Sequence, residues 1–281
     1  MTSNLISTEW LVEHLLDKSI QIIDASWHMP ASKRNAATEY AAAHIPGSRF
    51  FDLDAGSAPA TSLPHMLPTA EKFAHDMKKL SVSDAKHVVV YDSAGLFSAA
   101  RLWWMLKVFG HARASVLDGG LPKWQRENRA LESGEGPSTD ARHFTSRLAT
   151  DKVKSLQEVA TALQSGSAQI ADARSPTRFR GEEAEPRLGV RPGHMPGAHN
   201  VHYASLLNPD GRLKNPAALR STFATAGINL ANPVITSCGS GVTAAILTLA
   251  LAELGHKQTS LYDGSWTEWG ASDQAVAIGS D

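Results

Sequence analysis

The feature that most constrains this chain is an internal repeat. Short motifs of the first half return once in the second half, in the same order and after a nearly constant number of residues. The matched pairs are Asp24 and Asp172, His44 and His194, Asp92 and Cys238, and Trp124 and Trp269. Their offsets are 148, 150, 146 and 145 residues. Four ordered anchors with such similar offsets are hard to obtain by chance, so the sequence predicts two copies of one domain.

The repeat divides the 281 residues into two domains and a connector. We predict an N-terminal domain over 1–132, a linker over 133–151 and a C-terminal domain over 152–281. The linker sequence SGEGPSTDARHFTSRLATD is rich in Gly, Ser, Thr and charge, a composition typical of an exposed connector. At roughly 150 residues per domain, the length also favours two domains.

Both halves contain short, apolar, β-branched segments that predict buried strands. We expect strands at 20–24 (IQIID) and 86–91 (KHVVVY) in the first half, and at 234–237 (VITS) in the second. Helices alternate with these strands. Alternation of this kind predicts an α/β fold, with a mainly parallel sheet flanked by helices in each domain.

Local signals mark several helix ends. Thr8 is expected to cap the first helix, and a helix is expected over 98–109, ended by Gly110. Ser155 and Glu158 have the spacing of a capping box.

Composition excludes several functions. Lys plus Arg is 27 and Asp plus Glu is 28, so the net charge of -1 argues against a protein built chiefly to bind nucleic acid or anionic membrane. The single cysteine makes an internal disulfide impossible and fits a reducing compartment. The most apolar segment, 242–254, is too short to span a bilayer, which needs about 20 residues, and no secretory signal is recognisable. We therefore expect a cytoplasmic protein.

Cys238 is the strongest candidate for chemistry. It follows the predicted strand 234–237 and precedes a helix, the place where open α/β sheets bind ligands. The residues after it form a candidate persulfide-cradling loop, here called the cysteine loop, which consists of Gly239, Ser240, Gly241, Val242 and Thr243. Its two glycines let successive backbone N–H groups point towards the sulfur, and such a nest at a helix N-terminus favours a thiolate. That thiolate could attack an electrophilic sulfur and carry it as a persulfide. An inert, buried cysteine is the alternative.

The matching position in the first half is Asp92, which cannot act as a sulfur nucleophile. The repeat therefore predicts one active site in each chain. A cysteine phosphatase is disfavoured, because its loop needs an arginine six residues after the cysteine and this chain has Ala244 there.

These motifs together resemble the two-domain rhodanese-like sulfurtransferases over nearly the whole chain. The resemblance is carried by CGSGVT from Cys238, TSLPHMLP around His65, RFRGEEAEPR from Arg178 and YDGSW from Tyr262. In that family, CGSGVT is typical of members that use 3-mercaptopyruvate, whereas thiosulfate-using members typically have a charged Cys-Arg-Lys-Gly loop. The resemblance implies transfer of sulfur from 3-mercaptopyruvate to a thiol or cyanide, with release of pyruvate.

The resemblance also implies roles for particular residues. Arg178 and Arg187 match the family's substrate-binding arginines, whose planar guanidinium groups can each hold two oxygens. Solvated ion pairs at the surface, with the nearby glutamates 182, 183 and 185, are the alternative for both arginines. Arg180 is left unassigned. Ser240, His65 and Asp54 match residues that have been proposed to form a proton relay. A surface or structural role for His65 and a cap or turn role for Asp54 are the alternatives.

We expect no cofactor and no metal. One cysteine and scattered histidines give no ligand spacing, and no glycine-rich dinucleotide fingerprint follows a predicted first strand. His44 and His194 are expected to serve a turn of the scaffold.

Two other functions stay open from the sequence. One is a thiosulfate:cyanide sulfurtransferase, disfavoured because the neutral Gly239–Ser240 pair offers no cation to the thiosulfate dianion. The other is a non-catalytic persulfide carrier or redox sensor. The expected partners are 3-mercaptopyruvate and a thiol acceptor, either a small thiol or a thioredoxin-like protein.

Overall fold

The computed structural model describes residues 3–59, 61–136 and 143–279, so residues 137–142 of the predicted linker lie outside it. The chain forms two compact units. The first unit comprises Met1–Pro59, Leu67–Ala149 and Asn208–Leu213, and the second comprises Ala60–Met66, Thr150–Leu207 and Lys214–Asp281. Each unit thus includes one short segment from the other half of the sequence. Along the sequence, the boundaries 1–132, 133–151 and 152–281 stay a prediction.

Within the described residues, the first unit is built on a five-stranded parallel sheet. Its strands are β1 (Leu5–Ile6), β2 (Ile20–Asp24), β3 (Arg49–Phe50), β4 (His87–Tyr91) and β5 (Ala114–Leu117). They lie in the order β1-β5-β4-β2-β3, and every pairing is parallel. All five residues of β4 are buried, as expected of a β-branched central strand covered on both faces.

The described part of the second unit repeats this sheet strand for strand. Its strands are β6 (Val153–Lys154), β7 (Gln169–Asp172), β8 (His199–Asn200), β9 (Val234–Ser237) and β10 (Thr259–Tyr262). The order β6-β10-β9-β7-β8 is that of the first unit, and every pairing is again parallel. The predicted α/β fold with two parallel sheets is confirmed.

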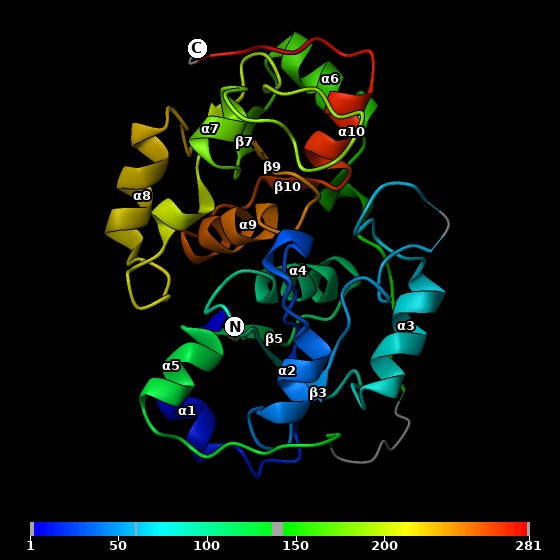
Figure 1. Ribbon diagram of the computed structural model, residues 1–281, viewed down its shortest axis with the longest axis vertical. Coiled ribbons are helices and arrows are strands. Elements are labelled where there is room, and N and C mark those ends of the chain that lie inside the picture. The colour runs from blue at the N-terminus through cyan, green and yellow to red at the C-terminus, as the bar shows by residue number, and fades with distance from the viewer. Residues whose placement is uncertain (1–2, 60, 137–142, 280–281) are drawn as a thin grey trace. The chain divides into compact units, whose positions relative to one another are not determined.

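Helices cover both faces of each sheet (Figure 1). The helices of the first unit are α1 (Thr8–Glu13), α2 (Ala36–Ala42), α3 (Ala70–Lys79), α4 (Ala99–Val108) and α5 (Gly120–Arg126), with a 3-10 turn at Pro30–Ser32. Those of the second unit are α6 (Leu156–Ser165), α7 (Pro176–Phe179), α8 (Pro216–Thr225), α9 (Ala244–Glu253) and α10 (Ser265–Ala271), with 3-10 turns at Thr150–Lys152 and Tyr203–Leu206.

The predicted helix ends were partly right. The helix expected over 98–109 forms as α4, and the Ser155–Glu158 capping box is present at the start of α6. The prediction for Thr8 was wrong. Ser7 caps α1 by accepting a hydrogen bond from the N–H of Trp10, and Thr8 is the first helical residue. The Thr8 hydroxyl instead donates to Glu127, a long-range partner that local sequence does not reveal.

His44 and His194 occupy equivalent, buried positions. In each ring, Nδ1 bonds to a backbone oxygen, that of Tyr40 in the first unit and that of Phe179 in the second, at 2.8 Å. Each ring also stacks on the side chain of the same residue. Both histidines pair with a distant segment through an isolated antiparallel bridge. These contacts support the scaffold role predicted for the repeated motif.

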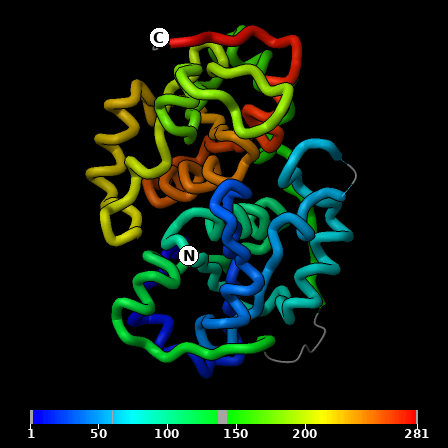
Figure 2. The backbone as a smooth tube through the Cα atoms, in the orientation of Figure 1, coloured from blue at the N-terminus to red at the C-terminus, as the bar shows by residue number. Residues whose placement is uncertain are grey.

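The spacing inside this motif differs between the units. Tyr40 lies four residues before His44, whereas Phe179 lies 15 residues before His194. The segment between Phe179 and His194 in the second unit, residues 180–193, is here called the arginine loop. Figure 2 shows this loop in yellow-green beside the red C-terminal segment. Arg191 fixes it there by donating to the backbone oxygens of Gly270 and Gln274.

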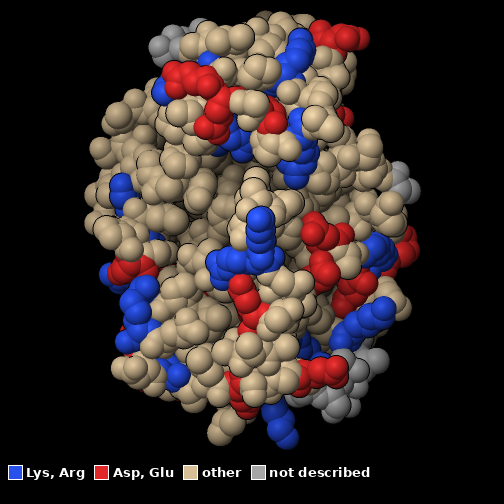
Figure 3. Space-filling view, viewed as in Figure 1, with Lys and Arg blue, Asp and Glu red and all other residues tan. Residues whose placement is uncertain are grey.

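Charged residues of both signs are interspersed on the face drawn in Figure 3, as the balanced composition leads one to expect. The most apolar helix, α9, has 10 residues, eight of them buried. Among the described residues, no helix is long and apolar enough to cross a membrane.

Candidate active site

Cys238 is the first residue after β9, and its side chain is buried. The start of α10 holds the backbone of the loop that follows. The N–H of Cys238 donates to the Ser265 hydroxyl at 3.2 Å, and its carbonyl accepts from Trp266 N–H at 2.9 Å. The next carbonyl, that of Gly239, accepts from both the N–H and the hydroxyl of Thr267, at 2.9 and 2.6 Å. The position of the cysteine is therefore set by its place at the end of β9 and by contacts from the start of α10.

The matching loop of the first unit indicates what such a loop can bind. The carboxylate of Asp92 accepts hydrogen bonds from four backbone N–H groups of the loop between β4 and α4. The donors are Ala94, Phe97, Ser98 and Ala99, at 2.7 to 2.9 Å. Converging N–H groups at a helix start form an anion-binding nest. In the first unit, this nest holds the chain's own carboxylate.

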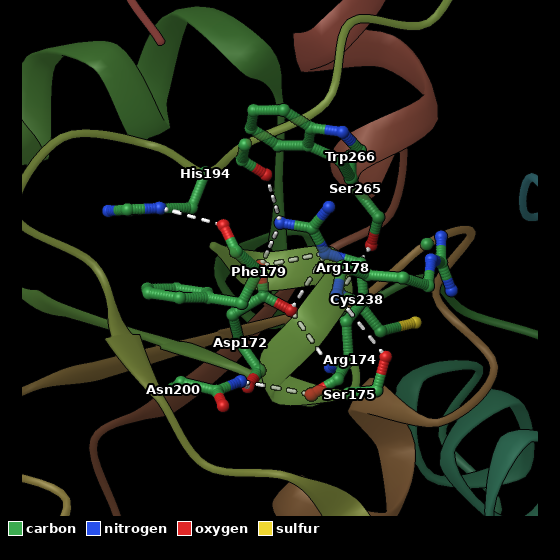
Figure 4. Close-up of polar contacts among 12 residues, drawn as sticks. Asp172, Arg174, Ser175, Arg178, Phe179, His194, Asn200, Cys238, Ser265 and Trp266 are labelled. Carbon is green, nitrogen blue, oxygen red and sulfur yellow. Dashed lines mark hydrogen bonds and ion pairs between the residues drawn. The ribbon is translucent and has the colours of Figure 1, made fainter. Parts of the chain in front are cut away.

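Arg178 lies directly beside the cysteine loop. It belongs to α7, which Ser175 caps by accepting from Arg178 N–H. A Cβ atom placed on Gly239 would lie 3.2 Å from Nη2 of Arg178 and 3.6 Å from Nη1. The guanidinium of Arg178 thus occupies the space beside Gly239, the residue that follows Cys238. In Figure 4, the sulfur of Cys238 and the end of the Arg178 side chain extend to the same side of the loop.

A buried chain of ion pairs links Arg178 to the end of β7. Glu185 accepts from Nε of Arg178 at 3.2 Å and also from Nη2 of Arg178. The same carboxylate accepts from Nη1 of Arg174 at 2.9 Å. Arg174 in turn donates to Asp172 at the end of β7, with Nη2 2.7 Å from Oδ2. Burial opposes the charge of Arg174, but the two carboxylates raise its pKa above the ordinary value. The ion pair weighed for Arg178 thus exists, and it is buried rather than at the surface.

His65 and Ser240 meet although they are 175 residues apart in the sequence. The distance from Nδ1 of His65 to Oγ of Ser240 is 2.9 Å, and both side chains are buried. His65 adopts a left-handed backbone conformation, with φ of 61°. Its segment, Ala60–Met66, belongs to the second unit, together with the cysteine loop.

Comparison with known proteins agrees with this geometry. The family model described as "Rhodanese-like domain" matches residues 7–127 and 155–272, one match for each unit. The chain belongs to the rhodanese-like family.

Individual rhodanese-like relatives match nearly the whole chain. The 3-mercaptopyruvate sulfurtransferase of Escherichia coli is 45% identical over 271 residues, which cover 96% of each chain. The human 3-mercaptopyruvate sulfurtransferase is 41% identical over 271 residues, covering 94% of this chain and 91% of that one. The crystal structure of SseA from Escherichia coli superposes with a TM-score of 0.87 at 44% identity, covering 94% of this chain and 99% of that one.

Arg187, Asp54 and Arg180 of this rhodanese-like chain have different surroundings. Arg187 is part of the arginine loop and is partly exposed. Asp54 belongs to the first unit, where its carboxylate accepts from the indole N–H of Trp27 at 3.1 Å. Arg180 pairs with Glu182 at the surface. The second unit thus contains Cys238, Ser240, His65, Arg178 and Arg187, and the first unit contains Asp54. The roles of all six residues stay predictions.

Sequence reasoning missed the supporting residues Arg174 and Glu185. A signal was present for Arg174. The repeat aligns IIDAS with IADAR, and both units have an aspartate at the end of this strand. Two residues later the first unit has Ser26, whereas the second has the cation Arg174. No comparable signal singled out Glu185 among the three glutamates of its segment. Among the described residues, no group of three or more His, Cys, Asp or Glu side chains could hold a metal ion.

Proposed function

We propose that this chain is a sulfurtransferase that moves sulfur from 3-mercaptopyruvate to a thiol or cyanide through a persulfide on Cys238. The observation that carries the proposal is the position of the Arg178 guanidinium beside Gly239, where an added Cβ atom would lie 3.2 Å from Nη2. A cation at this point can bind the anionic end of a donor one residue away from the nucleophile. The relatives that bear this activity in their names cover almost the whole chain.

The first step is attack of the Cys238 thiolate on the sulfur of the donor. A new S–S bond forms, the carbon–sulfur bond of mercaptopyruvate breaks, and its electron pair passes into the adjacent carbonyl to give the enolate of pyruvate. Arg178 holds the donor's carboxylate, and Arg187 is proposed as a second cation for the carboxylate and carbonyl oxygens. The result is an anionic persulfide on Cys238, which the N–H groups of the cysteine loop can stabilise.

A proton must then reach the enolate carbon to release pyruvate. The thiol of the donor supplies one proton, so the step balances without a further acid. Ser240 and His65 are 2.9 Å apart and can pass this proton between them, because a hydroxyl and an imidazole each donate and accept. Asp54 is proposed as the third member of this relay.

The second half-reaction returns Cys238 to its thiolate. An acceptor thiolate attacks the outer sulfur, the S–S bond to Cys238 breaks, and the acceptor leaves as a persulfide. Cyanide attacks in the same way and leaves as thiocyanate. We propose a small thiol or a thioredoxin-like protein as the acceptor in the cell. A cytoplasmic location is part of the proposal and is supported by the single cysteine.

The two alternatives predict different assays. A thiosulfate:cyanide sulfurtransferase would turn over thiosulfate faster than mercaptopyruvate. A persulfide carrier would accept sulfur from another protein but would bind neither donor. The neutral Gly239 and Ser240 and the buried Arg178–Glu185 pair favour a 2-keto acid donor.

The test is sulfur transfer by the purified protein with 3-mercaptopyruvate and thiosulfate side by side, using cyanide as the acceptor. We expect thiocyanate and pyruvate in equal amounts from mercaptopyruvate, and a strong preference for that donor. Cys238→Ser should abolish both products, with an unchanged circular dichroism spectrum. Preference for thiosulfate would overturn the donor, and residual turnover by the serine variant would remove Cys238 from the mechanism.

A further inference from the structure

Glu185 joins the two arginines that lie behind the cysteine loop. Oε1 accepts from Nη1 of Arg174 at 2.9 Å and from Nε of Arg178 at 3.2 Å, while Oε2 accepts from Nη2 of Arg178. Only 4% of the Glu185 side chain is exposed. A carboxylate this buried has lost its contacts with water, and here hydrogen bonds from two guanidinium groups replace them.

Arg174 gives this carboxylate an immobile anchor. Its side chain is 1% exposed and donates to Asp172 and to the carbonyl of Gly193. The guanidinium also lies over the ring of Trp266, 4.3 Å from the centroid. Glu185 is therefore fixed on its Arg174 side, and the position of Arg178 follows from it. Figure 4 shows Arg174 together with Asp172 and Trp266 near the end of β7.

The pairing with Glu185 also decides which edge of Arg178 stays available. A guanidinium has five N–H bonds, and Glu185 takes one on Nε and one on Nη2. The opposite end, formed by Nη1 and the second N–H of Nη2, lies next to position 239. This end is the part of Arg178 nearest to position 239.

We propose that Glu185 is a positioning residue, which holds Arg178 in the space above Gly239 so that this end binds the donor's carboxylate. The inference rests on the proposed function in taking the donor to be a carboxylate. It follows that position 239 carries no side chain because the guanidinium occupies that volume. Glu185 and Gly239 then act together to favour a carboxylate donor.

The geometry at Gly239 makes this inference testable. Its φ lies outside the left-handed region, so the backbone itself accepts alanine. The three atoms nearest to an added Cβ all belong to the Arg178 guanidinium, the closest at 3.2 Å. Gly239→Ala must therefore displace Arg178 by a few tenths of an ångström, and Glu185 resists that displacement.

The kinetic test compares Glu185→Gln with Glu183→Gln, an exposed glutamate of the same loop that accepts from Thr177. We expect Glu185→Gln to raise the KM for 3-mercaptopyruvate about tenfold with little change in kcat, because uniform binding is lost. Gly239→Ala should act in the same direction, and Glu183→Gln should match the parent protein. Alkylation of Cys238 by iodoacetamide, followed by mass spectrometry, should be unchanged in Glu185→Gln and Glu183→Gln, because this neutral reagent offers no anion to Arg178.

Equal kinetics for Glu185→Gln and Glu183→Gln would overturn the inference. So would a parallel loss of Cys238 alkylation by iodoacetamide, which indicates general damage to the site. Failure of the parent protein to release pyruvate from mercaptopyruvate would instead overturn the proposed function.

A double-mutant cycle tests the positioning independently of activity. If Glu185 holds Arg178 against position 239, freeing Arg178 lets it move away from an added methyl group. The drop in the thermal unfolding midpoint caused by Gly239→Ala should then be smaller in the Glu185→Gln background than in the parent protein. Equal drops in the two backgrounds would show that the residues are independent and would overturn the inference.

Discussion

The carboxylate of Asp92 stands in the first unit where the thiol of Cys238 stands in the second. Each is the first residue after the central strand of its sheet, β4 or β9, and each begins the loop into a buried helix. In the first unit, the backbone N–H groups of the loop converge on the carboxylate. The same scaffold thus carries a structural anion in one unit and a candidate nucleophile in the other.

The Asp92 carboxylate is expected to be important for stability. Asp92→Asn would keep the size of the side chain but would turn an amide NH₂ towards buried N–H donors. We expect the free energy of unfolding to fall by about 3 kcal/mol, because buried donors lose a charged acceptor. Urea denaturation at pH 7 measures this fall, with Asp151→Asn at an exposed position as the control. A loss equal to that of the control would show that the nest does not need the charge.

The contact between His65 and Ser240 predicts a donor-dependent effect. Ser240→Ala should lower kcat with 3-mercaptopyruvate by about 10- to 100-fold, since general acid–base catalysis contributes on this scale or more. Thiosulfate turnover should change little, because sulfite leaves without protonation of a carbon. Steady-state assays with both donors give the ratio, and Ser165→Ala on α6 is the control. Equal losses with both donors would indicate a role in loop structure rather than in proton transfer.

Arg187 is tested by a substitution that keeps its charge. Arg187→Lys should raise the KM for mercaptopyruvate more than that for thiosulfate, because lysine cannot hold two oxygens with a planar fork. Arg180→Lys serves as the control, since Arg180 pairs with Glu182 at the surface. A similar change with both donors would argue against a keto-acid contact by Arg187.

Asp24 predicts a pH-dependent stability. Burial raises the pKa of its carboxyl from 3.8 to about 6, although the N–H of Ser26 bonds to it. The folded protein therefore binds this proton more tightly than the unfolded chain. The stabilisation is fully present below pH 3.8 and is lost as the pH rises through the folded pKa of about 6.

Asp24→Asn removes this titration. The unfolding free energy of the variant relative to the parent protein should therefore rise between pH 4 and pH 7, by at most about 1.4 kcal/mol per pH unit. Urea denaturation of both proteins across this range measures the difference. Other titrating groups, such as His87, contribute equally to both unfolding free energies and so cancel in the difference. A difference independent of pH would show that Asp24 ionises normally in the folded protein.

Much of the scaffold follows from local sequence. Short β-branched strands separated by helices predict two parallel sheets, and β2 forms over the predicted residues 20–24. The capping box of α6 also needs only neighbouring residues. The repeat placed Cys238 after a central strand because strand, loop and helix are consecutive in the chain. These features depend on backbone propensity and hydrophobic pattern, which a few adjacent residues determine.

Tertiary structure decided which distant side chains meet. The segment of His65 lies in the first half of the sequence, yet it belongs to the second unit and brings its ring to Ser240. Three glutamates lie close to Arg178 in sequence, but only burial shows that Glu185 is the one that pairs with it, while Glu182 pairs with Arg180 at the surface. Ion pairs and hydrogen bonds of this kind form where packing removes water from two groups at once. That outcome depends on the whole fold, and the spacing of residues along the chain does not encode it.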